Sequence, residues 1–181
     1  MRKIPWSTAV VATVLACDSP TVQPPAADEL APAHGVGAIA ADFTPEVHQW
    51  LSDLRRLYAP LHSLERAQAA GFSAELSPCV EHPTDGGMGV HWGNPGRIDG
   101  TVAALEPEVL LFAPRPNGTY GLAAVEFIVP YAAWTSSTPP TLFGMEFHPN
   151  PGLELWMMHI WLWRNNPSGL FSDWNPAVSC P

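Results

Sequence analysis

From Phe72 onward, proline and glycine interrupt the chain every few residues, and this punctuation constrains the fold more than any other feature. The whole chain has 21 Pro and 14 Gly among 181 residues. Between the breaks lie short apolar runs rich in β-branched and aromatic residues, which are typical of strands. We therefore predict strands near residues 72–80, 88–92, 108–113, 119–129, 142–148 and 153–163.

The segment before this region instead has helical spacing. Residues Thr44–Glu46 have the order of an N-cap, a proline at the first helical position and an acid in the first turn. Apolar residues then recur on one stripe over Val47–Tyr58. Pro60 should end or kink this helix, and a second helical stretch over 61–70 should end at Gly71.

Together these patterns predict an α+β fold, with short N-terminal helices packed on an antiparallel β-sheet or partly closed β-barrel. Pro116–Gly118 should form a hairpin turn, because Asn-Gly readily takes positive φ. Strand alternation predicts one face of the following strand, made of Tyr120, Leu122, Ala124, Glu126 and Ile128.

The first residues have the form of an export signal. The basic start Met1–Lys3 precedes the apolar run Ile4–Ala16, which is too short to span a bilayer and fits a signal peptide. The run ends in Val14–Cys17, which resembles a lipobox, where a signal peptidase cuts before a lipid-bearing cysteine. We expect a lipoprotein signal peptide over residues 1–16 and a lipid on Cys17; the alternative is an ordinary secretory signal.

Behind this signal, the sequence predicts a tether and one domain. Residues 17–42 are rich in Pro and Ala, a composition that cannot bury a core and is typical of a semi-extended, lipid-anchored tether. Residues 43–181 should form a single globular domain. The expected location is the cell envelope, with the protein lipid-anchored to a membrane and facing the periplasm or the exterior.

The charge balance argues against nucleic acid as a partner. The net charge is −9, and removal of Arg2 and Lys3 with the signal leaves 6 basic against 17 acidic residues, with no Lys. Nucleic acids and anionic headgroups both need clustered Lys or Arg. The expected membrane partner is therefore reached through the lipid anchor.

Two further cysteines, Cys79 and Cys180, form an even pair in an oxidising compartment. We predict a disulfide between them; two buried free thiols are the alternative. Neither cysteine lies in a Cys-x-x-Cys spacing, so a redox motif is not expected.

Several stretches resemble those of an uncharacterised family of exported bacterial (lipo)proteins. They are Gly86–Trp92 (GGMGVHW), Pro107–Phe112, Val125–Phe127, and Asn166–Cys180 with its NPSG and DWNPAVSC segments. The likeness covers about residues 65–181. It implies one coherent exported domain and carries over no catalytic role.

Ionisable residues in or beside apolar strands are the candidate site. Glu126 is the one charged residue in Leu122–Val129, and His159 is the one ionisable residue in Leu155–Trp163. Such groups are costly to bury unless something pairs with them. Three imidazoles and one carboxylate suit a divalent transition metal, Zn, Fe, Mn or Cu. The predicted metal site consists of His91, Glu126, His148 and His159.

Two metal-free interpretations stay open. In the first, His159 is a hydrogen-bonded core histidine, Glu126 pairs with Arg164 or Arg97, and the other histidines face solvent. In the second, Glu126 and one histidine are a proton-transfer pair. Geometry separates the metal site from these two interpretations. Convergence of at least three donor atoms would favour the metal site, whereas His91 and His159 on opposite faces would exclude it.

No motif in the chain indicates an activity. Gly-x-Ser-x-Gly, His-Glu-x-x-His and Cys-x-x-Cys-His are absent. The Gly-rich stretch Thr84–Gly89 lacks a phosphate-loop ending and is typical of a turn. Eight Trp could pack a core or enclose a small-molecule ligand. The sequence thus supports two functions, a metal-binding domain of unknown activity or a non-enzymatic envelope lipoprotein that binds a small ligand or protein, and it leaves open whether the protein is an enzyme.

Overall fold

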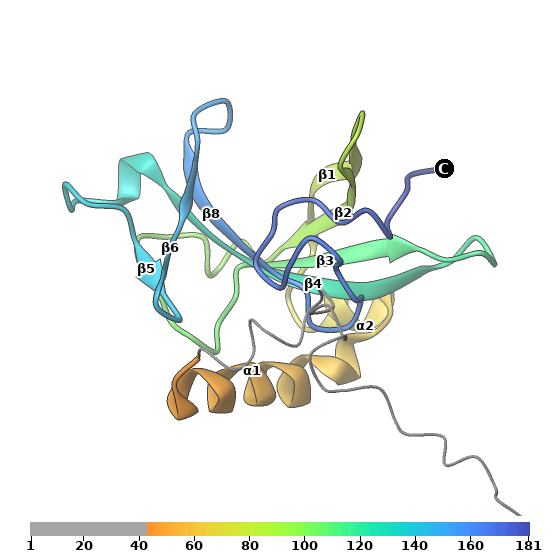
Figure 1. Cartoon of the computed structure of the whole chain (residues 1–181), viewed down its shortest axis with the longest axis horizontal. Coiled ribbons are helices and arrows are strands. Elements are labelled where there is room, and N and C mark those ends of the chain that lie inside the picture. The colour runs from red at the N-terminus through yellow and green to blue at the C-terminus, as the bar shows by residue number, and fades with distance from the viewer. Residues whose placement is uncertain (1–42) are drawn as a thin grey trace, which may run out of the picture. The chain divides into compact units, whose positions relative to one another are not determined.

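The computed structural model describes residues 43–181, in which helices lie against a curled antiparallel sheet (Figure 1). This confirms the predicted α+β fold. The sheet has the strand order β1-β2-β3-β4-β8-β7, and every neighbouring pair is antiparallel. The helical elements are α1 (Pro45–Tyr58), η2 (Ala59–Leu61), α2 (Leu64–Ala69) and η3 (Tyr131–Ala133). The strands are β1 (Ala74–His82), β2 (Gly86–Gly93), β3 (Val109–Pro114), β4 (Tyr120–Pro130), β5 (Thr141–Leu142), β6 (Met145–Glu146), β7 (His148–Asn150) and β8 (Leu155–Ile160).

The predicted signal peptide, the tether and the lipid on Cys17 fall outside these described residues and stay predictions. Within residues 43–181, no helix is long and apolar enough to cross a membrane.

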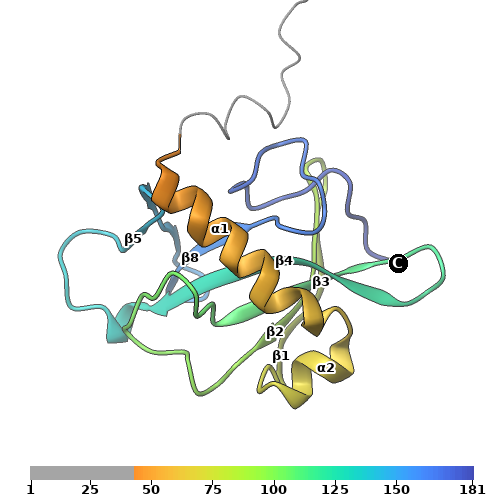
Figure 2. The same cartoon turned by 90° about the horizontal axis from the view of Figure 1, so that it is seen from below.

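The N-terminal helices form as the sequence predicts. Val47 N–H donates to the Thr44 hydroxyl at 3.3 Å, which caps α1, and Pro45 follows at the first helical position. The apolar stripe of α1 is buried against one face of the sheet, across which the helix lies (Figure 2). Pro60 lies in the 3-10 turn η2, and Gly71 ends the second helical stretch with a φ of 98°.

The predicted hairpin joins β3 to β4, but a bulge changes the faces that β4 presents. Gly118 has a φ of 76°, and Arg115 N–H donates to the Thr119 carbonyl at 2.8 Å. Further along, Ala124 pairs with Leu111 and Leu122 pairs with Phe112. Ala123 therefore has no partner in β3 and is the extra residue of a bulge. Leu122 therefore packs on the helix side of the sheet, and its predicted place on the face of Glu126 is wrong.

Two of the predicted strands are shorter than expected. The run 142–148 is divided, because Phe143 and Gly144 have φ of 55° and 77° and turn β5 back onto β6. The run 153–163 forms a strand only over Leu155–Ile160, and Glu154 before it has a φ of 54°. A positive φ at a non-glycine residue gives no compositional signal, so the sequence did not reveal these turns.

The central strands β3 and β4 are buried on both faces. One face packs on α1 through Leu110, Phe112, Phe127 and Ile160. The other packs the cluster Val109, Leu111, Ala124, Ile128 and Met157 against the C-terminal segment, which contributes Trp174 and Val178.

The C-terminal segment is held by backbone pairing and by a disulfide. Gly87 pairs with Asn175 in a β-bridge, and a Cβ on the neighbouring Gly86 would meet the Asn175 carbonyl oxygen, so the glycine-rich stretch permits this close approach. Cys79 and Cys180 are bonded, with Cα atoms 5.7 Å apart, which confirms the predicted disulfide.

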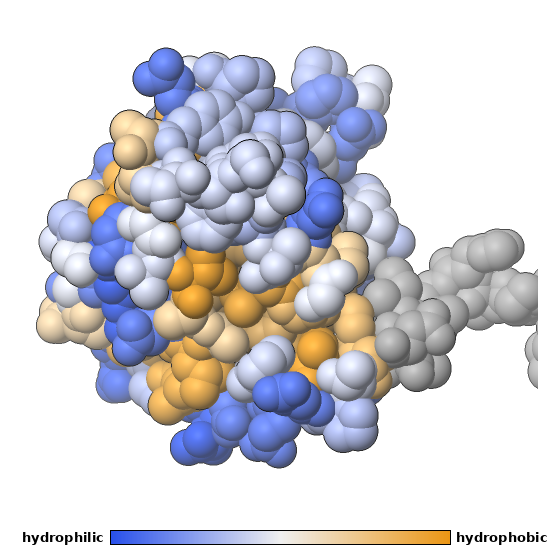
Figure 3. Space-filling view, turned by 90° about the vertical axis from the view of Figure 1, so that its left-hand side faces the viewer, coloured by the Kyte–Doolittle hydropathy of each residue, from blue (hydrophilic) through white to orange (hydrophobic). Residues whose placement is uncertain are grey.

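A hollow of about 540 Å³ lies between the start of α1 and the turn from β5 to β6. Phe43, Trp50 and Phe143 line it. The Trp50 ring packs edge-on against Phe143, and the Phe171 ring contacts both Phe43 and Phe143. Figure 3 shows hydrophobic residues gathered at the surface on this side of the molecule.

Glu108 is a buried carboxyl group that should make stability depend on pH. It is 3% exposed, and its Oε2 accepts a hydrogen bond from Ile128 N–H at 3.0 Å. Burial raises the pKa of Glu108 to about 8. The folded state therefore holds a proton that the unfolded chain releases above its ordinary pKa near 4.5, so the free energy of unfolding should fall as pH rises between 4.5 and 8.

Glu108→Gln should flatten that pH dependence, because an amide oxygen still accepts from Ile128 but does not titrate. One pKa unit corresponds to about 1.4 kcal/mol. By pH 8, the loss of unfolding free energy in wild type, which Glu108→Gln should lack, should therefore reach a few kcal/mol. Urea unfolding from pH 5 to pH 9 measures it, with the exposed Glu106→Gln as control. Parallel pH profiles for wild type and Glu108→Gln would contradict the assignment.

Candidate metal centre

The curl of the sheet brings three of the predicted residues together. Glu126 on β4 lies directly opposite His159 on β8 in the strand register. His91 lies on β2, and β3 and β4 separate it from β8. Three strand spacings of about 4.8 Å would hold β2 and β8 roughly 14 Å apart in a flat sheet. The two imidazole rings nevertheless lie 6.0 Å apart, so His91 and His159 share the inner face of the curl.

The donor atoms of these residues converge on one point. His159 Nε2 lies 3.5 Å from Glu126 Oε1, and His91 Nε2 lies 3.8 Å from Glu126 Oε2. All three residues offer a ligand atom within 4.8 Å of the others. Ligands about 2.1 Å from a tetrahedral zinc ion would be roughly 3.4 Å apart. A contraction of this cluster by up to about 1.4 Å would therefore bring the three ligand atoms to coordination distance.

Each histidine is fixed by a second polar group at its other nitrogen. Ser77 Oγ lies 2.8 Å from His91 Nδ1, and an Asp173 carboxylate oxygen lies 3.2 Å from His159 Nδ1. The same carboxylate contacts His148 Nδ1 at 3.1 Å. In metal sites, such partners at the outer nitrogen orient the imidazole and leave the inner nitrogen for the ion.

The protonation of Asp173 determines which nitrogen of His159 is free. Burial raises the pKa of Asp173, but its contacts with His159 and His148 outweigh this and hold it below its ordinary value. The ionised carboxylate accepts the proton of His159 Nδ1. Replacement of the Nε2 proton by a metal ion would then leave the lone pair of Nε2 pointing toward Glu126. This nitrogen is fully buried and makes no hydrogen bond.

The surrounding charges favour a cation between these side chains. Burial lowers the pKa of His159, but the facing carboxylates of Glu126 and Asp173 prevail and raise it. Burial raises the pKa of Glu126 and lowers that of His91 to about 3. His91 is therefore neutral at physiological pH, as a metal ligand must be.

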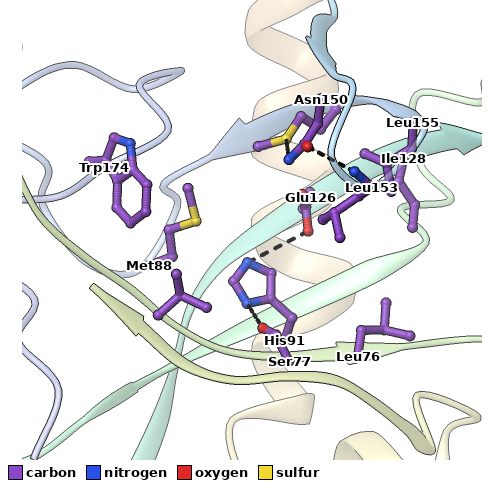
Figure 4. A pocket seen from close by; sticks show the side chains of 12 residues that line it. Leu76, Ser77, Met88, His91, Glu126, Ile128, Asn150, Leu153, Leu155 and Trp174 are labelled. Atoms are coloured by element: carbon purple, nitrogen blue, oxygen red, sulfur yellow. Dashed lines mark hydrogen bonds and ion pairs between the residues drawn. The ribbon is translucent and has the colours of Figure 1, made fainter. Parts of the chain in front are cut away.

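A pocket of about 220 Å³ opens directly onto the cluster (Figure 4). His91 and Glu126 line it, whereas His159 is fully buried behind them. Figure 4 shows the His91 ring between Ser77 and Glu126 in the pocket wall. Solvent and small molecules would therefore reach the cluster from this pocket.

The fourth predicted ligand, His148, does not belong to the cluster. It lies on the short edge strand β7, its side chain is 51% exposed, and it contacts Asp173 instead. The structure thus brings three of the four predicted residues together, and Asp173 lies between His148 and His159. The suggested arginine partners of Glu126 are also occupied elsewhere, since Arg97 donates to Tyr58 and Arg164 to the Ala177 carbonyl.

The two outer partners have weaker signals in the sequence. Ser77 faces His91 in the strand register, but one serine in a strand is unremarkable in sequence. Asp173 lies in a loop-like tail, where periodicity carries no information.

Comparisons with protein-family models, curated proteins and solved structures found no match, so the site is interpreted from its own geometry.

Proposed function

We propose that the protein is an extracytoplasmic metal-binding domain whose ligands are His91, Glu126 and His159. The environment of His159 Nε2 supports this proposal most strongly. This nitrogen is fully buried, it has no hydrogen-bond partner, and it faces a carboxylate oxygen at 3.5 Å while the other ring nitrogen is fixed. An unpaired buried polar atom is costly unless a ligand satisfies it.

Two imidazoles and one carboxylate are a ligand set for Zn, Fe, Mn or Cu. Three protein ligands leave a further coordination position, as catalytic zinc sites and non-haem iron sites do. The pocket beside His91 and Glu126 is where that position would be reached.

The location in the cell envelope rests on two supports of different kinds. The Cys79–Cys180 disulfide indicates an oxidising compartment. Attachment to a membrane by a lipid on Cys17 rests on the lipobox resemblance alone. Mass spectrometry of the protein from a bacterial host tests it, because a diacylglyceryl group adds a defined mass that Cys17→Ser would remove.

Elemental analysis of the purified full-length protein tests the metal. We expect stoichiometric metal after reconstitution with Zn, Mn, Fe or Cu, and none in His159→Ala. The exposed His62→Ala is the matched control and should bind like wild type. If none of the four ions binds wild type, the cluster is structural and the alternative, a lipoprotein that binds a small ligand or protein partner, becomes the better function.

Asp173→Asn should weaken metal binding about 10- to 100-fold, the usual cost of removing a group that orients a metal-bound histidine. The amide keeps an oxygen for His159 Nδ1 but removes the charge. Competition with a chromophoric chelator measures the affinity. Asp85→Asn is the control, since Asp85 pairs with His82 at 3.1 Å in an exposed pair. Equal affinities for Asp173→Asn and wild type would show that Asp173 does not support the site.

A further inference from the structure

The pocket beside the metal centre has features that define its ligand. Resting on the metal-binding function above, we propose that it binds a small monocarboxylate with an apolar tail, with the carboxylate on the metal ion and the tail in the pocket. The shape, lining and charge of the pocket support this ligand class.

The pocket wall is almost entirely apolar away from the cluster. Its volume of about 220 Å³ is below the roughly 300–1,000 Å³ of pockets for drug-sized ligands, so the ligand should be small. Apolar contact area would supply most of its affinity. The apolar lining residues are Leu76, Val80, Met88, Ile128, Leu153, Leu155, Met157 and Trp174.

The side chains of Ser77 and Asn150, which line the pocket outside the cluster, are already occupied. Ser77 Oγ contacts His91. Asn150 donates to the Met157 sulfur at 3.4 Å and accepts from Leu153 N–H at 3.1 Å (Figure 4). A bound molecule therefore finds its polar partner at the cluster, and its other atoms meet hydrocarbon.

Charge selects the polar group of the ligand. A divalent ion held directly by two neutral imidazoles and one carboxylate has a local charge of +1. The ionised Asp173 contacts the outer nitrogen of His159 and does not line the pocket. No Lys or Arg lines the pocket, so the ion would be its only cation. An anionic oxygen donor would neutralise that charge, whereas an ammonium group would be repelled from it in a poorly hydrated space.

The mouth of the pocket is also apolar. Leu153 and Leu76 line the pocket and are 69% and 45% exposed, which is high for large apolar side chains. They come from the turn before β8 and from β1, on opposite sides of the pocket in Figure 4. An apolar tail entering between them would cover both side chains.

The test uses full-length protein loaded with Co²⁺, whose visible spectrum reports changes in its coordination. Octanoate should change the spectrum saturably, whereas octylammonium should not. Octanoate should bind more tightly than acetate by at least about tenfold, since each buried CH₂ contributes about 0.8 kcal/mol. His159→Ala, which should lack the ion, should not bind octanoate.

A variant at the pocket mouth separates the tail from the metal. Leu153→Glu should leave Co²⁺ binding unchanged and weaken octanoate about tenfold, because it replaces an apolar contact with a like charge. The exposed Leu57→Glu on α1, on the other face of the sheet, should behave like wild type. Leu153 is exposed enough that this change should not prevent folding.

The outcomes separate this inference from the metal-binding function. Stoichiometric Co²⁺ with no spectral response to octanoate would overturn the ligand assignment and leave the metal site intact. Equal binding of octylammonium, or octanoate binding to His159→Ala, would also overturn it. Absence of binding of Co²⁺ and of Zn, Mn, Fe and Cu would overturn both.

Discussion

A saturating divalent metal should raise the free energy of unfolding of the wild-type protein, and Glu126→Gln should abolish this gain. At a metal concentration 100-fold above Kd, binding to the folded state alone adds about 2.7 kcal/mol. The amide is a poor metal ligand and removes the one charged donor of the set. Thermal or urea unfolding with and without the ion measures the difference.

The metal-free forms should show the opposite order. Glu126 is 5% exposed, and burial raises its pKa, so its ionised form is costly in the empty site. Metal-free Glu126→Gln should therefore be at least as stable as metal-free wild type. Equal stabilisation of both proteins by metal would contradict the assignment and place the ion elsewhere, for example at the exposed His148 and Asp173 pair.

Replacing both Cys79 and Cys180 by Ser should lower the free energy of unfolding by about 2–5 kcal/mol. The disulfide links residues 101 positions apart, and a loop of that size is worth roughly 4.7 kcal/mol in the chain-entropy model. It also fixes the segment that supplies Asp173, so metal affinity should fall as well. Urea unfolding and metal titration of the double variant measure the two effects.

A reductant provides the control for the disulfide. Dithiothreitol should lower the stability of wild type to that of the double variant and should leave the variant unchanged. The Gly87–Asn175 bridge still holds the tail, so the fold should persist. A double variant as stable as oxidised wild type would contradict the role assigned to the bond.

The elements that the sequence predicts well are those specified by local interactions. The cap at Thr44, Gly71 at the end of the second helical stretch and the Asn-Gly hairpin each depend on backbone geometry within a few residues. The extra residue Ala123 and the turn at Phe143 depend on packing between strands, so the alternation of β4 and the single strand over 142–148 were wrong.

The difference between local sequence and long-range packing also explains which residues of the candidate site could be predicted. Glu126 and His159 could be found because each is a lone ionisable residue in an apolar run, and such a residue needs a partner. His148 looked similar in sequence, but β7 is a short edge strand, so its side chain faces outward. Asp173 could not be found, because only the path of the C-terminal tail brings it to His159.

Anomalous diffraction from crystals of the metal-loaded protein, recorded at the absorption edge of the bound metal, would locate the ion relative to its three ligands. We expect one anomalous peak about 2.0–2.2 Å from His91 Nε2, His159 Nε2 and a carboxylate oxygen of Glu126. A peak at His148 and Asp173, or a fully occupied metal that leaves His159 Nε2 unligated, would contradict it.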